Sequence, residues 1–236
     1  MSTRLPEKDG ELGFLDGLAR ATSRRKFLQW SGVTLAVVAV GCSDNTSNTP
    51  TPTGGAVDLG TGDTGVLNYA YALEQLEAAF YTQVVAGAYY GSAPVAEQTI
   101  LSDIKNHEVI HRDFLKAALG SAAIADLTVD FTSVNFADRT SVLSTAKTFE
   151  DLGVAAYNGA GHLLTTPANL LTAGKIVSVE ARHAAAIRDL LQPASFAGSD
   201  VVDANGLDRA KAPSEVLTAA DPFITTTVTA NNLPTT

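Results

Sequence analysis

Two Glu-x-x-His motifs carry the clearest chemistry in this sequence, Glu108 with His111 and Glu180 with His183. Residues three apart share a helix face, so each pair could bind one metal ion together. A carboxylate and an imidazole suit iron, manganese or zinc. One such motif is a weak signal, because four residues recur by chance, whereas two are much stronger. The sequence therefore predicts a metal centre made of two similar half-sites.

Two further glutamates belong to a second repeat, this time with tyrosine. Glu74 is followed seven residues later by Tyr81, and Glu150 in the same way by Tyr157. Seven residues are nearly two helical turns, so each tyrosine lies on the face of its own glutamate but about 10 Å along the helix. We therefore expect each tyrosine to hydrogen-bond to a ligand on another helix.

The four glutamates lie on helix faces that are otherwise apolar; Ile104 and Leu115, for example, flank Glu108. Burying an isolated carboxylate costs several kcal/mol or more. Two divalent cations would neutralise four carboxylates and two neutral histidines. The single cysteine, Cys42, excludes a Cys-based zinc cluster and an intramolecular disulfide, so oxygen and nitrogen atoms must hold any metal.

Glu77 competes with Glu74 for the ligand position on the first helix, because it lies one turn further along. The internal repeat separates the two: Glu74 aligns with Glu150, whereas Glu77 aligns with Gly153. We therefore assign the ligand to Glu74.

Four other polar residues are interpreted as lying outside the site. His107 points about 100° away from its neighbour Glu108 around the helix and is interpreted as a surface or boundary residue. His162 has no counterpart in the other half and is interpreted as structural. Asp113 and Asp151 fall off the ligand faces and are interpreted as solvated acids.

Hydrophobic spacing predicts four helices that would position these residues. Asp63 or Thr64 could cap the first helix, and Gly120 is suited to the end of the second. The expected helix ranges are about 66–85, 95–119, 140–164 and 167–192.

The connections between these helices indicate their topology. Residues 87–94 and 165–167 form short links, whereas residues 121–138 form a long one in which residues 127–131 could be extended. Short, long, short is the pattern of a bundle with one crossover connection. The sequence therefore predicts an all-α four-helix bundle over residues 65–192, with a long crossover between its second and third helices.

This constellation resembles the ferritin-like di-iron carboxylate superfamily, which uses one Glu from each of two helices and Glu-x-x-His from each of the other two. The resemblance implies six metal ligands in two half-sites: Glu74, Glu108 and His111 in one, and Glu150, Glu180 and His183 in the other. It also implies that Glu108 and Glu180 bridge two metal ions, iron or manganese, and that Tyr81 and Tyr157 support the ligands. Residues 73–81 further resemble an exported branch related to plant desiccation-related proteins.

The N-terminal segment resembles an export signal of the twin-arginine type. Arg24 and Arg25 precede an apolar run over residues 32–41, which at about ten residues is too short to span a bilayer. Cys42 ends this run as in a lipoprotein signal, and ordinary cleavage with release is the alternative. Residues 43–64 are polar and rich in Ser, Thr, Pro and Gly, which predicts a flexible linker. These features place the protein in the periplasm or cell envelope. They also favour a cofactor, because this route carries folded proteins.

The remaining features bear on partners. A net charge of −9 argues against nucleic acid and against an anionic membrane surface, so we expect membrane contact only through a lipid at Cys42. Expected partners are a small-molecule oxidant or a metal ion, and we allow for a homodimer. Residues 193–236 are expected to be irregular, with a short helix beginning at Pro213 and an unstructured end over residues 231–236.

Three functions fit these observations. The first is a di-iron or di-manganese oxidoreductase with ferroxidase, peroxidase or catalase-like activity. The second is a non-enzymatic, stress-protective bundle of the cell envelope whose metals are structural. The third is iron storage in a hollow shell, which a lipid anchor and a long leader disfavour.

Overall fold

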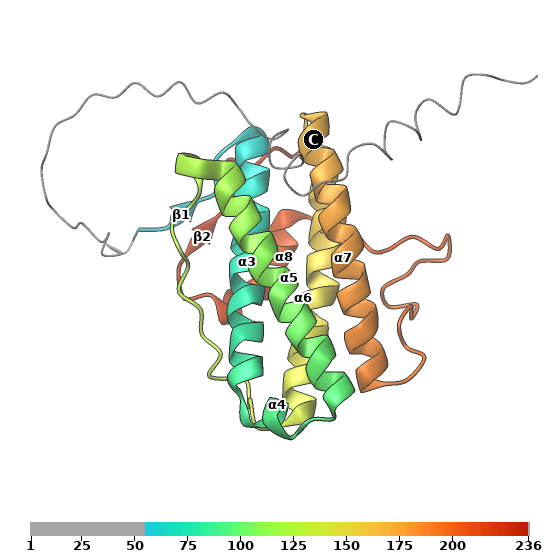
Figure 1. The fold of residues 1–236 in the computed structure, drawn as a ribbon. Helices are drawn as coiled ribbons and strands as arrows, with labels where there is room; N and C mark the ends of the chain where they lie inside the picture. The colour runs from blue at the N-terminus through green and yellow to red at the C-terminus, as the bar shows by residue number, and fades with distance from the viewer. Residues whose placement is uncertain (1–54, 236) are drawn as a thin grey trace, which may run out of the picture. The chain divides into compact units, whose positions relative to one another are not determined.

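The computed structural model describes residues 55–235, and four long helices form its frame (Figure 1). The first two and the last two pack as antiparallel hairpins. The prediction of an all-α four-helix bundle is confirmed. The four helices are α3 (Gly62–Ala86), α5 (Val95–Leu119), α6 (Arg139–Ala160) and α7 (Pro167–Leu191).

Short elements complete the links inside each hairpin. Helix α4 (Ala88–Ser92) joins α3 to α5, and the 3-10 turn η2 (Gly161–Leu163) leads from α6 towards α7. Gly120 ends α5 with a φ of 55°, a backbone conformation that glycine adopts without strain. Another 3-10 turn, η1 (Gly120–Ala122), follows it.

Helix α3 begins four residues before the predicted start, so Asp63 lies in its first turn and Thr61 is the N-cap residue. The predicted cap at Asp63 or Thr64 is therefore wrong. The Asp63 carboxylate instead accepts hydrogen bonds from the backbone amides of Thr165 and Thr166, at 2.8 and 3.0 Å, and from the Asn169 side chain at 2.8 Å. These bonds, led by the one from Thr165, lower the pKa of Asp63. Asp63 thus joins the start of α3 to the start of α7.

The crossover between α5 and α6 runs along the outside of the bundle (Figure 1). Two buried polar side chains of α3 hold it in place. Asn68 donates to the Ala122 carbonyl at 2.9 Å and accepts from the Ile124 amide at 3.0 Å, while Gln75 accepts from the Leu127 amide at 2.7 Å. The expected extended stretch is present as one antiparallel bridge, between Val129 and Ile224.

An aromatic cluster fills the core away from the start of α3. Phe80 of α3 and Phe149 of α6 pack edge to face with ring centroids 5.0 Å apart, and Phe223 packs on Phe149 at 4.8 Å. Phe131 of the crossover contacts Phe80 at 5.7 Å. The crossover and the C-terminal extension therefore share the core of the bundle.

Both ends of the described segment are more ordered than the sequence suggested. Strand β1 (Val57–Asp58) pairs in parallel with β2 (Val228–Thr229), so the flexible linker predicted over residues 43–64 is wrong at its end. Leu233 is 7% exposed and Asn232 donates to Asp58 at 2.6 Å, so residues 231–235 are not unstructured as expected. The predicted signal, Cys42 and the first part of the linker lie outside the described residues.

The rest of the extension also packs on the bundle. It contains helix α8 (Pro213–Ala220), which begins at Pro213 as predicted, and the 3-10 turn η3 (Asp221–Phe223). The backbone at Lys211 crosses α6 so closely that a Cβ at Gly159 would lie 1.8 Å from the Lys211 carbonyl oxygen. Only glycine permits this contact. No helix within residues 55–235 has both the length and the apolar character needed to cross a membrane.

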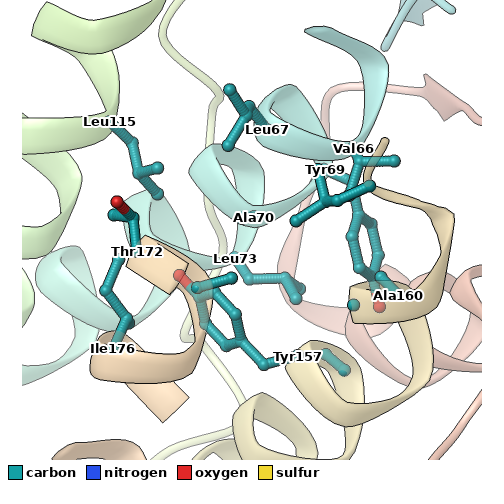
Figure 2. A pocket seen from close by; sticks show the side chains of 14 residues that line it. Val66, Leu67, Tyr69, Ala70, Leu73, Leu115, Tyr157, Ala160, Thr172 and Ile176 are labelled. Atoms are coloured by element: carbon teal, nitrogen blue, oxygen red, sulfur yellow. The ribbon is translucent and has the colours of Figure 1, made fainter. Parts of the chain in front are cut away.

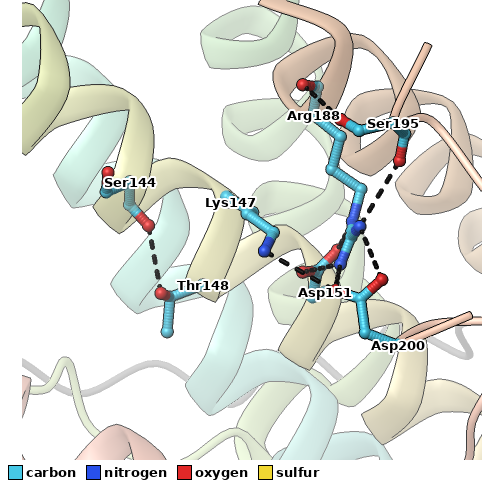
Figure 3. A network of polar contacts seen from close by, with 7 residues as sticks. All are labelled: Ser144, Lys147, Thr148, Asp151, Arg188, Ser195 and Asp200. Carbon is cyan, nitrogen blue, oxygen red and sulfur yellow. Dashed lines mark hydrogen bonds and ion pairs between the residues drawn. The ribbon is translucent and has the colours of Figure 1, made fainter. Parts of the chain in front are cut away.

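An ion-pair network centred on the buried Arg188 joins α6, α7 and the extension (Figure 3). Arg188 is 3% exposed and donates to both carboxylate oxygens of Asp151, at 2.7 and 2.8 Å, and to Asp200 at 2.6 Å. The guanidinium lowers the pKa of Asp200 to about 2. The interpretation of Asp151 as a solvated acid is therefore wrong, because its charge is paired with a buried arginine.

Candidate metal centre

The bundle brings the six predicted ligand residues together in its interior. Its four glutamates are fully buried, and His183 is 4% exposed. Their side chains form two overlapping groups in which one ligand atom from each residue lies within 4.8 Å of the others. Both groups contain Glu108 and Glu180. One group adds Glu74 and His111, and the other adds Glu150 and His183.

The first group is centred on His111 of α5. Its Nδ1 lies 2.9 Å from Oε1 of Glu180, 3.4 Å from Oε2 of Glu74 and 3.8 Å from Oε2 of Glu108. The nearest carboxylate therefore comes from the opposite hairpin, not from the histidine's own Glu-x-x-His motif.

The second group repeats this geometry around His183 of α7. Its Nδ1 lies 2.8 Å from Oε1 of Glu108, 3.5 Å from Oε2 of Glu150 and 3.9 Å from Oε2 of Glu180. The two hairpins are thus related by an approximate two-fold axis that passes through the centre. Glu108 and Glu180 lie between the two groups, each offering one oxygen to each histidine.

The two tyrosines hold the outer glutamates across this axis. Tyr157 of α6 donates to Oε1 of Glu74, and Tyr81 of α3 donates to Oε1 of Glu150, each at 2.5 Å. The predicted hydrogen bond to a glutamate on another helix is present in both halves. Burial, followed by the adjacent glutamate, raises the pKa of each tyrosine well above its usual range, so both hydroxyls keep their protons.

The comparison with known families agrees with this geometry. A family model described as a ferritin-like domain matches residues 62–193, more than half of the 236-residue chain. The chain belongs to the ferritin-like domain family. The curated proteins include no match to it. The ferritin-like prediction is confirmed at the level of the superfamily, while the twin-arginine signal and the desiccation-related branch stay predictions.

The donor atoms of this ferritin-like protein fit metal cations. Eight buried oxygen and nitrogen atoms of the six residues have no hydrogen-bond partner outside the centre within residues 55–235 and face only one another. Leaving such atoms unsatisfied would cost about 1–3 kcal/mol each, and more for charged groups. The atoms are Oε2 of Glu74 and Glu150, both carboxylate oxygens of Glu108 and Glu180, and Nδ1 of His111 and His183.

Without cations, protons take up part of this negative charge. Burial raises the pKa of Glu74 to about 7 and that of Glu180 well above its usual range. Burial also opposes charge on Glu108, but the two histidines outweigh it and lower the pKa of Glu108 to about 2. Against the effect of burial, the carboxylates raise the pKa of His111 to about 12 and that of His183 to about 10. A metal that binds here must displace protons.

His107 has a contact that the sequence does not predict. Its side chain is exposed, as expected, but its ring stacks on His183 with centroids 5.1 Å apart, and its Nδ1 lies 2.9 Å from Nε2 of His183. This contact leaves Nδ1 of His183 facing the glutamates. Val179 stands at the equivalent position before Glu180, so the repeat gave no signal for this role. His162 is exposed, and Asp113 is exposed beside Arg112.

Glu77 is also buried beside the centre, at 4% exposed. It belongs to neither donor group, whereas Glu74 does, so the choice of Glu74 agrees with the geometry. Burial, followed by the charges of Glu180, Glu108 and the other two glutamates, raises the pKa of Glu77 well above its usual range. A fifth carboxylate therefore lies within electrostatic reach of all four.

An apolar cavity of about 20 Å³ lies beside Tyr157 (Figure 2). That volume is enough for about one small molecule. Tyr157 connects the cavity to the centre through its bond to Glu74. The other walls come from all four long helices and include Leu67, Tyr69, Leu73, Leu115 and Ile176.

Proposed function

We propose that this ferritin-like protein binds two metal ions, iron or manganese, and acts as an oxidoreductase on O2, H2O2 or Fe(II). The observation that carries the proposal is the pair of overlapping donor groups that share Glu108 and Glu180. Four carboxylates and two neutral histidines balance the charge of two divalent cations. When bound, two adjacent ions that can each change charge by one supply a two-electron exchange with a small oxidant.

The protein's own residues would bind the ions, orient the ligands and exclude water. Tyr81 and Tyr157 each fix one oxygen of an outer glutamate and leave the other facing its histidine. His107 holds the ring of His183. Such partners of ligands commonly change metal affinity 10–100-fold.

The size of the cavity beside Tyr157 supports the proposal that the substrate is a small molecule. Its volume of about 20 Å³ is too small for an organic substrate of ordinary size, and its walls are almost wholly apolar. Dioxygen is both small and apolar, and hydrogen peroxide is nearly as small. Fe(II) needs a polar route, and His111, with a side chain 12% exposed, is the ligand nearest to solvent.

Metal content and turnover test the proposal together. Protein loaded anaerobically with Fe(II) or Mn(II) should hold two ions per chain by elemental analysis, and should then consume O2 or H2O2. The double variant Glu108→Gln/Glu180→Gln should hold none. Glu97→Gln is the matched control, because Glu97 is a buried glutamate of α5 that pairs with Arg139 outside the centre. Fewer than two ions in the parent, or two ions without turnover, would contradict the proposal.

A non-enzymatic role is the alternative, and the complete burial of the four glutamates favours it. Metals would then act mainly to compensate buried charge in a stress-protective bundle of the cell envelope. In that case metal binding should raise the unfolding temperature strongly, by mass action, and no rate should accompany it. Thermal unfolding with and without metal, measured beside the turnover assay, separates the two roles.

We also propose export by the twin-arginine route to the periplasm or cell envelope, with a lipid on Cys42 when cleavage is of the lipoprotein type. The paired Arg24 and Arg25 before an apolar run support this proposal. Replacing both arginines with lysine should retain the protein in the cytoplasm, as cell fractionation would show. Mass spectrometry of the mature N-terminus would distinguish lipidation from simple cleavage.

A further inference from the structure

Four large apolar side chains are exposed on the outer side of α5 and α7. Ile110 and Phe114 lie on neighbouring turns of α5, and Leu170 and Leu171 lie in the second turn of α7. Each of the four side chains is at least 40% exposed. Single exposed apolar residues are common on protein surfaces, whereas a group of them in one place indicates a surface that binds another molecule.

The two pairs lie at the same level of the bundle. Leu115, which follows Phe114, and Thr172, which follows Leu171, line the same cavity (Figure 2). Helices α5 and α7 lie side by side (Figure 1), and the stacked rings of His107 and His183 join them. The exposed side chains therefore belong to one surface, with Leu170 at its edge near Gly161.

Two basic residues continue this surface along α7. Lys175 and Arg182 are both exposed, and they follow Leu171 by four and eleven residues, which places all three on one helix face. Between Pro167 and Arg188 the sole acidic residue of α7 is Glu180, whose side chain is fully buried. The outer face of α7 is thus locally positive, although the chain carries a net charge of −9.

We propose that the outer surface of α5 and α7 binds an anionic phospholipid membrane. The apolar side chains enter the headgroup region and the two cations pair with lipid phosphates, as on helices that lie in a membrane interface. The inference goes beyond the proposed metal chemistry and does not require a lipid on Cys42. The surface consists of Ile110, Phe114, Leu170, Leu171, Lys175 and Arg182.

A second copy of the chain is the other occupant that an exposed apolar face commonly takes. Pairing about a two-fold axis would place this surface against the same surface of the other copy. Lys175 and Arg182 would then face a surface of their own sign, and like charges across an interface repel each other. Charge complementarity therefore favours anionic phospholipid over a second copy.

The position of the surface also agrees with the proposed lipid on Cys42. Asp63, in the first turn of α3, accepts bonds from the two backbone amides that precede α7, so α3 begins beside the start of α7. Gly55 follows Cys42 by thirteen positions, and a chain of that length spans at most about 45 Å. A lipid on Cys42 would keep the start of α7 close to the membrane.

Vesicle binding tests the proposal, with Cys42→Ala in every variant so that no attached lipid contributes. The full chain should sediment with vesicles of phosphatidylcholine and phosphatidylglycerol, and less so at higher salt. Lys175→Gln/Arg182→Gln should weaken this binding at least tenfold, because two cations near the lipid phosphates are lost. Lys116→Gln/Lys211→Gln is the matched control, since it removes two exposed basic residues outside the surface and should bind like the parent.

A tryptophan within the surface gives a local measurement. Trp30→Phe first removes the single tryptophan of the chain. In that background, the emission of Leu171→Trp should shift to the blue when the anionic vesicles are added. Val95→Trp should show no shift, because Val95 is an exposed apolar residue at the opposite end of the bundle, where α5 begins.

Equal vesicle binding by the parent and Lys175→Gln/Arg182→Gln, or no blue shift for Leu171→Trp, would overturn the proposal. A dimer in analytical ultracentrifugation that Phe114→Ser/Leu171→Ser abolishes, without vesicle binding by the parent, would assign the surface to a second copy and would also overturn it. These substitutions lie outside both donor groups, so failure here is distinct from failure of the metal site.

Discussion

The hydroxyl of Tyr157 donates to Oε1 of Glu74 at 2.5 Å, from one helical hairpin to the other. Tyr81 makes the matching bond to Glu150 in the opposite direction. The hairpins are therefore joined twice within the core, and both joints end on predicted metal ligands. Stability of the bundle and orientation of the ligands depend on the same two hydrogen bonds.

Tyr157→Phe should lower the free energy of unfolding of the metal-free protein by about 1–3 kcal/mol, because it leaves a buried carboxylate oxygen without its donor. Tyr81→Phe should have a similar effect, since the two bonds are equivalent. Urea unfolding measures both changes. Tyr90→Phe, a change on the partly buried short helix α4, should leave stability nearly unchanged. A large difference between Tyr157→Phe and Tyr81→Phe would contradict the approximate symmetry.

The shared and unshared glutamates should differ in the number of ions lost. Glu74→Gln removes a ligand from one donor group, so the variant should keep one ion per chain. Glu108→Gln removes a ligand from both groups and should weaken both ions. Elemental analysis after dialysis against a weak chelator would show the difference. Equal loss in the two variants would argue against bridging by Glu108.

His107→Ala should reduce metal affinity about 10–100-fold, because His183 loses the contact that fixes its ring. Competition with a coloured chelator measures the change. His162→Ala is the control, since His162 is exposed in η2, apart from the donor groups. If both variants retain parental affinity, the contact between His107 and His183 has no part in metal binding.

Asp63 should make stability depend on pH in the acid range. Its folded-state pKa lies below the ordinary value of 3.8, so its contribution is present above about pH 4 and is lost as the pH falls further. At neutral pH, Asp63→Ala should lower the free energy of unfolding by about 1 kcal/mol, as for the loss of a helix cap. Urea unfolding of parent and variant should show this difference shrinking below about pH 4. A constant difference down to acid pH would mean that the charge of Asp63 is not involved.

Gly159→Ala should destabilise the protein by about 1–3 kcal/mol, because the new Cβ would collide with the Lys211 carbonyl. Residues 193–235 should then detach more readily and be cut sooner in limited proteolysis. Gly174→Ala is a matched control in α7, where a Cβ meets nothing within 4 Å, and it should stabilise by about 0.5–1 kcal/mol. Stabilisation by both changes would mean that the extension does not depend on this contact.

The helical bundle and its candidate metal centre could be predicted from the sequence because both are built from an internal repeat. Two Glu-x-x-His motifs and two Glu-to-Tyr spacings place equivalent side chains on equivalent helix faces. Proline and glycine gave the limits of α5 and α7 closely, since their effects are local. Helix periodicity places the ligand side chains on the inner helix faces, so they converge once the four helices pack around one axis.

Predictions from the sequence were wrong or incomplete for residues whose roles break the internal repeat or depend on partners far away in the chain. Nothing near Asp151 indicates Arg188, 37 residues away, as its partner. The position of Asp63 predicted a cap for its own helix, yet its carboxylate oxygens accept hydrogen bonds from residues more than 100 positions later in the chain. Polar composition at both ends suggested disorder, but parallel pairing of β1 with β2 cannot be read from such short strands.

Because each donor group draws on both hairpins, neither hairpin holds a complete one. A single α3–α5 unit would present Glu74, Glu108 and His111 and lack the third carboxylate of this donor group, Glu180. Two copies of such a unit, paired about a two-fold axis, would supply the same set twice. The two halves of this chain therefore take the places that two subunits would take in a symmetric dimer, with Glu77 in one half where the other has Gly153.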